Sequence, residues 1–507
     1  MATAPEDITA TGLVKGLGLL DAATLVIGSM IGSGIFIVSA EISREVASPA
    51  LLIGAWLITG FLTIIGALTY GELAAMMPRA GGQYVYLRES LGPLWGFLYG
   101  WTLFLVIQTG TIAAVGVAFG KFLGIFWPAI SSSHWIIHFW KVPKFAIGPM
   151  ILGGMDVGLN TQNLVAILVV VALSIVNIFG VKTGAFIQNI FTTAKVSALL
   201  GLVVFGVLLG RNAQAVAANF GANFWHNSGL GILHDVGGGV GGSVLVSTLT
   251  VLAVAQVGSL FSADSWHNVT FTAGEVKNPS RNLPLSLALG TGVVIALYIA
   301  CNFIYLSALP LVGSPTGATL IERGIQYARE DRVATAVMTQ MFGSIGGKLM
   351  AVAIMISCFG CCNGLILAGA RVYYAMAKDG LFFRGVARLH PSYKTPAVSL
   401  MVQMAWTCVL CISGSYSQLL DYIIFAVLVF YVLTIFGLFV LRRTHPEAER
   451  PYKAIGYPVL PAIYIVMALF IDVVLLRYKP QYTWPGLFIV LLGIPVYYIW
   501  RPRSANA

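Results

Sequence analysis

Two short stretches rich in glycine and serine lie in the middle of apolar segments. Residues 28–36 read GSMIGSGIF, and residues 258–266 read GSLFSADSW. Clustered small residues weaken a helix, and a broken helix is tolerated in a membrane only where its freed backbone groups find partners. A bound ligand can supply those partners, although small residues also serve in close helix packing. Because two such stretches occur, we favour a ligand site.

The polar ends created by such breaks suit a zwitterion. At the first break, the N–H groups of Ser33 and Gly34 would face a carboxylate at the positive end of a half-helix. The carbonyl groups around Met30 would suit an ammonium. Beside the second break, Phe261 could cover a bound substrate as a gate, whereas Asp264 would bind the ammonium or, more commonly, cap the following half-helix. These residues predict an amino acid site.

Lys195 is placed too deep in its apolar segment to reach water easily. It lies about twelve residues from one end and fifteen from the other, which is about 18–22 Å at 1.5 Å per residue. Buried ammonium groups in membranes mark ion or proton paths by default. We therefore expect Lys195 to couple transport to an ion or proton, or alternatively to lock helices together through their carbonyl groups.

Four further polar residues within apolar segments could contact a substrate side chain. They are Gln108, Thr109, Asn363 and Tyr422. Each could equally be an interhelical polar contact, which is the commoner fate. The six cysteines fall inside apolar runs and the loop histidines are scattered, so we expect neither a metal nor a cofactor.

The composition fixes the kind of molecule that must position these residues. The chain has 507 residues, of which 58% are hydrophobic and 9% charged, with a mean hydropathy of +0.86. This excludes a soluble enzyme and predicts an all-α polytopic membrane protein. About twelve transmembrane helices are expected, starting near residues 17, 49, 92, 162, 184, 243, 284, 345, 396, 418, 457 and 484.

The net charge of +10 is spread among the loops, which argues against a nucleic-acid partner. Most of the Lys and Arg residues fall on the side of the two termini if the number of spans is even. The positive-inside rule then places both termini in the cytoplasm. We expect a multi-pass protein of the plasma membrane, which would be the inner membrane in a bacterium, with the lipid bilayer as its surroundings.

The two breaks recur five spans apart, in helices one and six, which cross the membrane in opposite directions. This pattern predicts an inverted repeat of five plus five helices with two C-terminal helices outside it. The predicted divisions are a cytoplasmic tail (1–16), the first repeat (17–209), an extracellular loop (210–242), the second repeat (243–443), helices 11 and 12 (444–500) and a cytoplasmic tail (501–507). A second long external loop spans residues 127–161.

Four motifs in this order resemble the amino acid/polyamine/organocation (APC) transporter superfamily, in particular its L-type amino acid transporter branch and prokaryotic relatives. They read GSGIF at 32–36, PRAGGQYVY at 78–86, FSADSW at 261–266 followed by EVKNP at 275–279, and RVYYAMAKDG at 371–380. The resemblance implies the LeuT-like fold, with discontinuous helices 1 and 6 and alternating access around the breaks.

The resemblance also implies roles for individual residues. The substrate carboxylate would meet Ser33 and Gly34, and its amine would meet carbonyl groups near Met30, Phe261 and Asp264. Phe261 matches the gating aromatic of the family. Lys195 matches a lysine that, in sodium-independent members, stands where sodium-coupled relatives hold an ion.

We therefore expect a sodium-independent secondary transporter of neutral L-amino acids, working by proton symport or by exchange. The loop at 127–161 has no cysteine, so a disulfide-linked glycoprotein partner is not expected, and the protein would be a monomer or a homodimer. The alternatives are an amino acid-sensing receptor with the same fold and a polytopic membrane enzyme. The enzyme reading lacks a nucleophile or base constellation in the deep helices.

Overall fold

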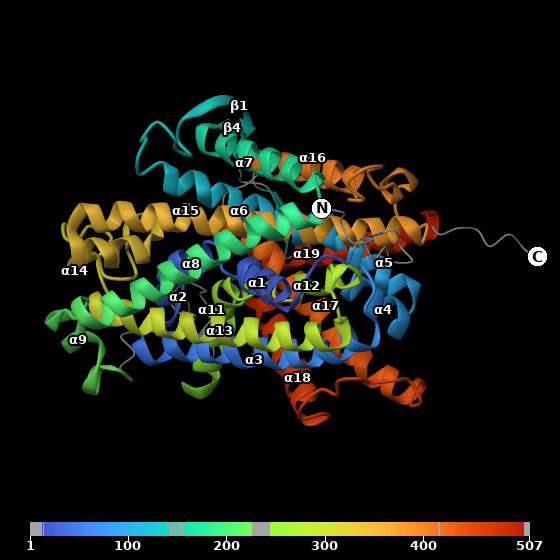
Figure 1. The fold of residues 1–507 in the computed structure, drawn as a ribbon. Helices are drawn as coiled ribbons and strands as arrows, with labels where there is room; N and C mark the ends of the chain where they lie inside the picture. The colour runs from blue at the N-terminus through green and yellow to red at the C-terminus, as the bar shows by residue number, and fades with distance from the viewer. Residues whose placement is uncertain are drawn as a thin grey trace, which may run out of the picture.

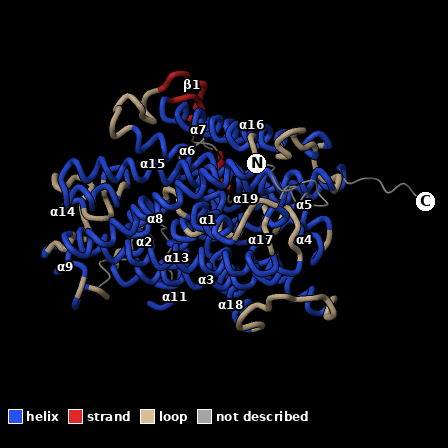
Figure 2. Tube along the Cα trace, in the orientation of Figure 1, coloured by secondary structure: helices blue, strands red, loops and turns tan. Residues whose placement is uncertain are grey.

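The computed structural model is a bundle of long helices with few strands (Figures 1 and 2). It describes residues 13, 15–141, 143, 145–147, 150–152, 156–225, 244–413 and 416–500. The fold confirms the predicted helical membrane protein. Ten helices of the described part are long and apolar enough to cross a membrane, and two shorter apolar helices cover 247–262 and 397–412.

The first half of the chain contains both an interrupted helix and a helix with a π-helical turn. Its elements are α1 (Leu19–Met30), α2 (Gly34–Val46), α3 (Pro49–Met76), α4 (Gln83–Leu91), α5 (Pro93–Thr102), the π-helix η1 (Leu103–Ile107), α6 (Gln108–Leu123), α7 (Thr161–Ile178), α8 (Val181–Leu209), α9 (Ala213–Asn219) and the 3-10 turn η2 (Gly221–Asn223). Proline begins α3 and α5, where its missing N–H and fixed φ are compatible with a helix start.

The second half also begins with an interrupted helix. Its elements are α11 (Val244–Ser262), α12 (Asn268–Phe271), η3 (Ala273–Glu275), α13 (Pro279–Ala308), α14 (Leu320–Arg323), η4 (Arg329–Asp331), α15 (Val333–Lys378), η5 (Arg384–Ala387), α16 (Ala397–Ser413), α17 (Tyr416–Thr444), α18 (Val459–Tyr478) and α19 (Pro480–Trp500). The run labelled α15 is divided by non-helical Gly343 (φ 65°) into a short helical segment and a long helix, and the long helix starts at the predicted position near 345.

The strands lie in the long loop between α6 and α7. Strand β1 (Trp135–Lys141) pairs antiparallel with β4 (Asp156–Asn160), and β2 (Phe145–Ile147) pairs antiparallel with β3 (Met150–Leu152). This segment was expected to be a loop without regular structure. The strands are an addition to the predicted all-α architecture outside the helical bundle.

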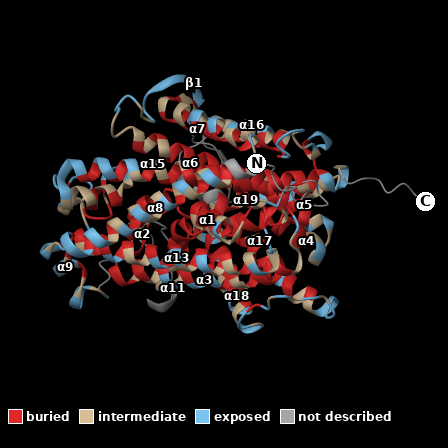
Figure 3. Cartoon of the chain, in the orientation of Figure 1, coloured by how far each residue is buried: buried red, intermediate tan, exposed pale blue. Residues whose placement is uncertain are grey.

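The two ends of the bundle can be named by short helices. The α4 face carries α4 and the adjoining end of α5, and the opposite α14 face carries α9 and α14 (Figure 1). Buried residues gather along the middle of the bundle, and exposed residues lie on its outside (Figure 3). Apolar side chains such as Val207, Leu208 and Ile499 are largely exposed, as expected where a helix faces lipid.

Candidate substrate site at the two helix breaks

The first break separates α1 from α2 at residues 31–33. Ile31 leaves the helical conformation (φ −78°, ψ 90°), and Ser33 forms the start of α2. Within the described part of the chain, the N–H groups of Gly34 and Ile35 have no hydrogen-bond acceptor. They belong to the first turn of α2, where a helix leaves its N–H groups unpaired. The geometry is that of an anion site at a helix N-terminus.

The second break separates α11 from α12. Helix α11 ends at Ser262, and Ser265 adopts a left-handed conformation (φ 68°) before α12 begins at Asn268. The side chain of His267 does not cap α12, and the N–H of Asn268 instead donates to the carbonyl of Ser265 (3.2 Å). The Asp264 carboxylate accepts a hydrogen bond from the N–H of Ser265 within the break, and its role as a cap of the following half-helix stays a prediction.

The two breaks lie against each other. A Cβ atom on Gly34 would lie 2.2 Å from Oγ of Ser262 and 2.9 Å from its Cα, so this approach requires glycine. The hydroxyl of Tyr298 on α13 is 3.0 Å from the carbonyl oxygen of Met30 and 3.0 Å from that of Ser262. One buried tyrosine thus joins the last carbonyl group of α1 to the last carbonyl group of α11.

Lys195 on α8 contributes an ammonium to the first break. Its Nζ donates to the carbonyl groups of Gly28 (2.8 Å), Ile31 (2.8 Å) and Ser357 (3.2 Å), and its residue is 1% exposed. Three carbonyl oxygens match the three N–H donors of an ammonium group. The carbonyl groups freed by the break thus bind a cation that the protein itself carries.

Helix α15 supplies further partners for the same carbonyl groups. Ser357 donates its hydroxyl to Ile31 (3.0 Å) or Gly32 (2.9 Å), and the Cys361 thiol donates to Ser29 (3.1 Å). All six cysteines are free thiols, in keeping with their interpretation as packing residues. The first break is therefore held by side chains from α8, α13 and α15.

Asp264 has a partner that the sequence analysis did not name. Tyr431 on α17 lies with its hydroxyl 2.5 Å from Oδ1 of Asp264 and 2.6 Å from Nδ1 of His267. All three side chains are buried. A cavity of about 10 Å³ adjoins Asp264 and Tyr431 and is lined also by Trp266 and Tyr464. This is room for one water molecule and not for a larger ligand.

The other predicted site residues are Phe261, Gln108, Thr109, Asn363 and Tyr422. Phe261 is 7% exposed and lies one residue before the end of α11. Gln108 donates to the carbonyl of Leu365 (2.8 Å), and Thr109 donates to that of Phe104 (2.6 Å). Asn363 donates to Gln188 Oε1 (3.0 Å). The last three side chains make interhelical or intrahelical bonds, and their role as substrate readers stays a prediction. Tyr422 has a side chain outside the described part of the structure.

Charged groups hold the α4 face together. Arg371 on α15 forms a bidentate ion pair with Glu275 (2.8 and 3.1 Å), and both side chains are buried. The carbonyl of Glu275 accepts hydrogen bonds from Gly16 and Leu17, and Lys277 donates to the carbonyl of Leu17 (2.8 Å). The chain segment before α1 is thereby attached to the segment after α12.

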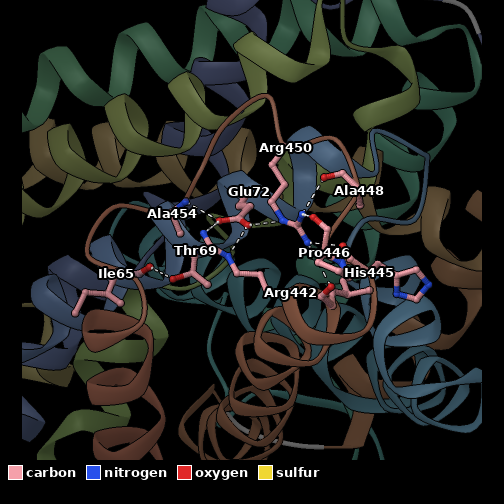
Figure 4. Close-up of polar contacts among 10 residues, drawn as sticks. Ile65, Thr69, Glu72, Arg442, His445, Pro446, Ala448, Arg450 and Ala454 are labelled. Carbon is pink, nitrogen blue, oxygen red and sulfur yellow. Dashed lines mark hydrogen bonds and ion pairs between the residues drawn. The ribbon is translucent and has the colours of Figure 1, made fainter.

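A second group on this face surrounds Glu72 at the end of α3 (Figure 4). Its carboxylate accepts from Arg442 (2.6 and 2.9 Å) and from the N–H of Ala454 (2.7 Å), and Arg450 lies 3.4 Å away. The Glu72 side chain is fully buried. This cluster connects α3 to the end of α17 and to the loop before α18.

Helix α4 is fastened separately. Tyr84 donates its hydroxyl to Asp379 (2.7 Å), which also forms an ion pair with Arg88. Burial, together with the neighbouring Asp379 carboxylate, raises the pKa of the Tyr84 hydroxyl above its ordinary value, so it remains a proton donor. The contact ties α4 to the end of α15.

Sequence reasoning missed Tyr298, Tyr431, His267 and Ser357. Tyr298 and Tyr431 lie in apolar helices, where an aromatic residue gives no signal of a polar contact. His267 follows the second break directly, and this position was the one usable signal. Glu72 and Arg371, two further charged residues of apolar segments, are both held in ion pairs.

Comparison with known proteins identifies the family of this chain. The family model described as "Amino acid permease" matches residues 17–497 of the chain. The chain belongs to this family. This match confirms the resemblance drawn from the motifs. Both broken helices of this permease lie inside the matched region.

Its relatives over nearly the whole length are amino acid transporters and exchangers. The permease is 31% identical to the serine/threonine exchanger SteT of Bacillus subtilis, over 98% of this chain and 99% of that protein. It is 27% identical to the human b(0,+)-type amino acid transporter 1 (96% and 88%) and 26% identical to the human cystine/glutamate transporter (97% and 87%). The permease is therefore an amino acid transporter.

Proposed function

We propose that this protein is a sodium-independent exchanger of small neutral L-amino acids. The observation that carries this proposal is the Lys195 ammonium on the carbonyl groups of Gly28 and Ile31. A carbonyl cluster of this kind would suit a metal cation, but here it is filled by a tethered positive charge. Sodium would have to displace that charge, so transport should not need it.

The first turn of α2 supports recognition of the carboxylate. The unpaired N–H groups of Gly34 and Ile35 offer two donors at the positive end of a helix. Once the breaks separate, the substrate amine would donate hydrogen bonds to the carbonyl of Met30, Phe261 or Ser262. Alternatively, it would pair with the carboxylate of Asp264. Tyr298 and Tyr431 hold some of these acceptors in the present conformation, so they would have to yield to the amine.

Small size and neutrality follow from the same contacts. The breaks approach so closely at Gly34 and Ser262 that a large side chain would need a wide separation. Apart from Lys195 and Asp264, no charged side chain of the described residues hydrogen-bonds the break segments. SteT, by its name, exchanges serine and threonine, which are small and neutral.

The proposal extends to the placement of the protein in its membrane. The α4 face would lie in the cytoplasm, together with both termini, and the protein would act in the plasma membrane without enzymatic activity. Neither a disulfide-linked partner nor a cofactor would be needed. The oligomeric state would be a monomer or a homodimer.

Exchange in reconstituted vesicles tests the proposal. Proteoliposomes without sodium, preloaded with unlabelled L-serine, should take up radiolabelled L-serine from outside. Gly34→Ala should lose most of this uptake, because its new Cβ collides with Ser262. Gly292→Ala is the matched control, since a Cβ at that position on α13 meets no atom within 4 Å.

Two results would overturn the proposal. Uptake that requires sodium would contradict the role given to Lys195. Binding of L-serine to the purified protein, without uptake of any neutral amino acid into loaded vesicles, would instead indicate a receptor.

A further inference from the structure

We propose that Asp264, Tyr431 and His267 form a proton relay across the second break, through which amino acid transport is coupled to proton movement. The inference rests on the proposed function and adds a second transport mode to it. Besides exchanging one amino acid for another, the protein would carry an amino acid together with a proton into a compartment that holds no amino acid. The three residues are called the relay below. In this proposal the proton passes between side chains at the facing ends of α11 and α12 and on α17. Lys195 keeps its proton and remains a fixed charge.

The first argument is the chemistry of the bridging group. The Tyr431 hydroxyl is 2.5 Å from Asp264 Oδ1 and 2.6 Å from His267 Nδ1, and it carries a single proton. A hydroxyl between two such groups can donate to one only while it accepts from the other. Two arrangements of the same heavy atoms are therefore possible.

In the first arrangement, Tyr431 donates to the Asp264 carboxylate, and Nδ1–H of His267 donates to Tyr431. In the second, the protonated Asp264 carboxyl donates to Tyr431, and Tyr431 donates to Nδ1 of His267. A proton taken up at Nε2 of His267 converts the first into the second. The Nδ1 proton passes to the Tyr431 oxygen as the original hydroxyl proton passes to Asp264, so one proton enters and Asp264 gains one.

The second argument is the position of the relay on the broken helix. Asp264 follows the end of α11 at Ser262, and His267 immediately precedes α12. Tyr431 belongs to α17, which is continuous from Tyr416 to Thr444. Movement of either half-helix must change at least one of the two hydrogen bonds. The protonation state of Asp264 is thereby linked to the opening of the site.

The third argument is the surroundings of the relay. The titratable groups that face it are Tyr70 of α3, Tyr464 of α18, Tyr99 of α5 and Cys361 of α15. None of them hydrogen-bonds a relay residue in the described structure, and no Lys or Arg pairs with Asp264 there. An excess proton on the relay thus has no other charged partner. The adjoining cavity of about 10 Å³ has room for one water molecule that could carry a proton to Asp264.

Lys195 differs from the relay in this respect. Its ammonium donates to three backbone carbonyl oxygens, and a backbone carbonyl is too weak a base to take the proton from an ammonium. Lys195 thus lacks a neighbouring base to which its proton can pass. The relay offers both an acid and a base within hydrogen-bond distance of one hydroxyl.

Proton flux and amino acid flux can be measured in the same vesicles. Sodium-free proteoliposomes containing a pH-sensitive dye but no amino acid are given external L-serine under an inward proton gradient. The unmodified protein should acidify the lumen and accumulate radiolabelled L-serine, and a protonophore should abolish the accumulation. Tyr431→Phe removes the bridging oxygen, and His267→Asn keeps an acceptor near Nδ1 but cannot carry the proton onward.

Both variants should lose serine-dependent acidification and the gradient-driven accumulation. A single symmetric peak in size-exclusion chromatography and an unchanged melting temperature show that each variant is folded. The ratio of proton to serine flux is the quantity compared. Tyr464→Phe is the matched control, because it removes a hydroxyl that lines the same cavity without bonding the relay. It should keep the ratio of the unmodified protein.

The possible failures are distinct. Absence of serine exchange by the unmodified protein would overturn the proposed function and, with it, this inference. Serine exchange without any serine-dependent acidification would overturn the relay alone. An unchanged proton-to-serine ratio in both Tyr431→Phe and His267→Asn would do the same.

Discussion

Lys195 places a side-chain ammonium on backbone carbonyl groups at the first break. Its three hydrogen bonds end on carbonyl groups of α1 and α15, so its charge fixes the shape of the first break. The alternative reading, that Lys195 locks helices together, describes the same contacts. The two roles differ in what is lost when the ammonium is removed.

Removing the ammonium should stop transport. Lys195→Ala leaves the carbonyl groups of Gly28 and Ile31 without a cation, so we expect serine exchange to fall by about tenfold or more, since several charge-assisted hydrogen bonds are lost. Lys348→Ala, on an exposed position of α15, should exchange normally. Exchange that survives Lys195→Ala at the rate of the unmodified protein would contradict the role of this ammonium as a fixed charge on the first break.

Tyr298 should act on stability as well as on transport. Tyr298→Phe removes one hydroxyl proton, which can be donated to the carbonyl of Met30 or to that of Ser262. The Met30 carbonyl also accepts from the N–H of Gly32 (2.9 Å), so the variant would chiefly leave the buried carbonyl of Ser262 without this donor. An unsatisfied buried polar group costs about 1–3 kcal/mol. The variant should therefore unfold at a lower temperature in detergent than Tyr464→Phe does, and equal melting temperatures would show that the bridge contributes little.

At the scale of elements, the sequence predicted the interrupted helices but not what surrounds them. Glycine and serine in an apolar run weaken a helix locally, so the breaks at residues 31–33 and 263–267 could be read directly. Tyr298 and Tyr431 could not, because their partners are distant in sequence and a hydrophobic helix has no periodic pattern that marks one aromatic as polar. The kink at Gly343 within α15 lies at the predicted helix start near 345, because a glycine-rich segment favours a helix boundary.

The Glu72 cluster should determine how firmly α17 and the following loop are held. Glu72→Gln removes the charge that binds Arg442 and Arg450, and loss of one partner from a buried ion pair costs about 3 kcal/mol or more. Limited proteolysis should then cut the segment between α17 and α18 faster than in the unmodified protein. Glu447→Gln, an exposed change in the same loop, is the control, and similar cleavage of both variants would argue against the cluster.

At the scale of the whole molecule, ion pairs hold both the α4 and the α14 face. The α4 face has the pairs of Glu275, Glu72 and Asp379, and the α14 face has Arg44 with Asp331 (2.7 Å) and the neighbouring Glu45 with Lys479 (3.1 Å). The excess of basic residues expected on the side of the termini predicts which face meets the cytoplasm.

Cysteine labelling in intact cells tests that orientation. Ser132 is exposed in the loop after α6, toward the α14 face, and Ser392 is exposed between η5 and α16, toward the α4 face. A membrane-impermeant maleimide should label Ser132→Cys in intact cells but Ser392→Cys only after permeabilisation. Unmodified protein corrects for the native cysteines, and the reverse labelling pattern would invert the proposed topology.

The hydrogen bond from the N–H of Lys277 to the carbonyl of Leu17 joins residues separated by more than half of the chain. During synthesis, the segment before α1 therefore emerges long before its partner exists. At about 5–20 residues per second, the wait is on the order of 10–50 s. Throughout this interval, the N-terminal end of α1 lacks the backbone hydrogen bonds to Glu275 and Lys277 that hold it in the finished protein. A nascent chain halted before residue 275 should thus expose that end to proteases, whereas one extended beyond residue 280 can protect it.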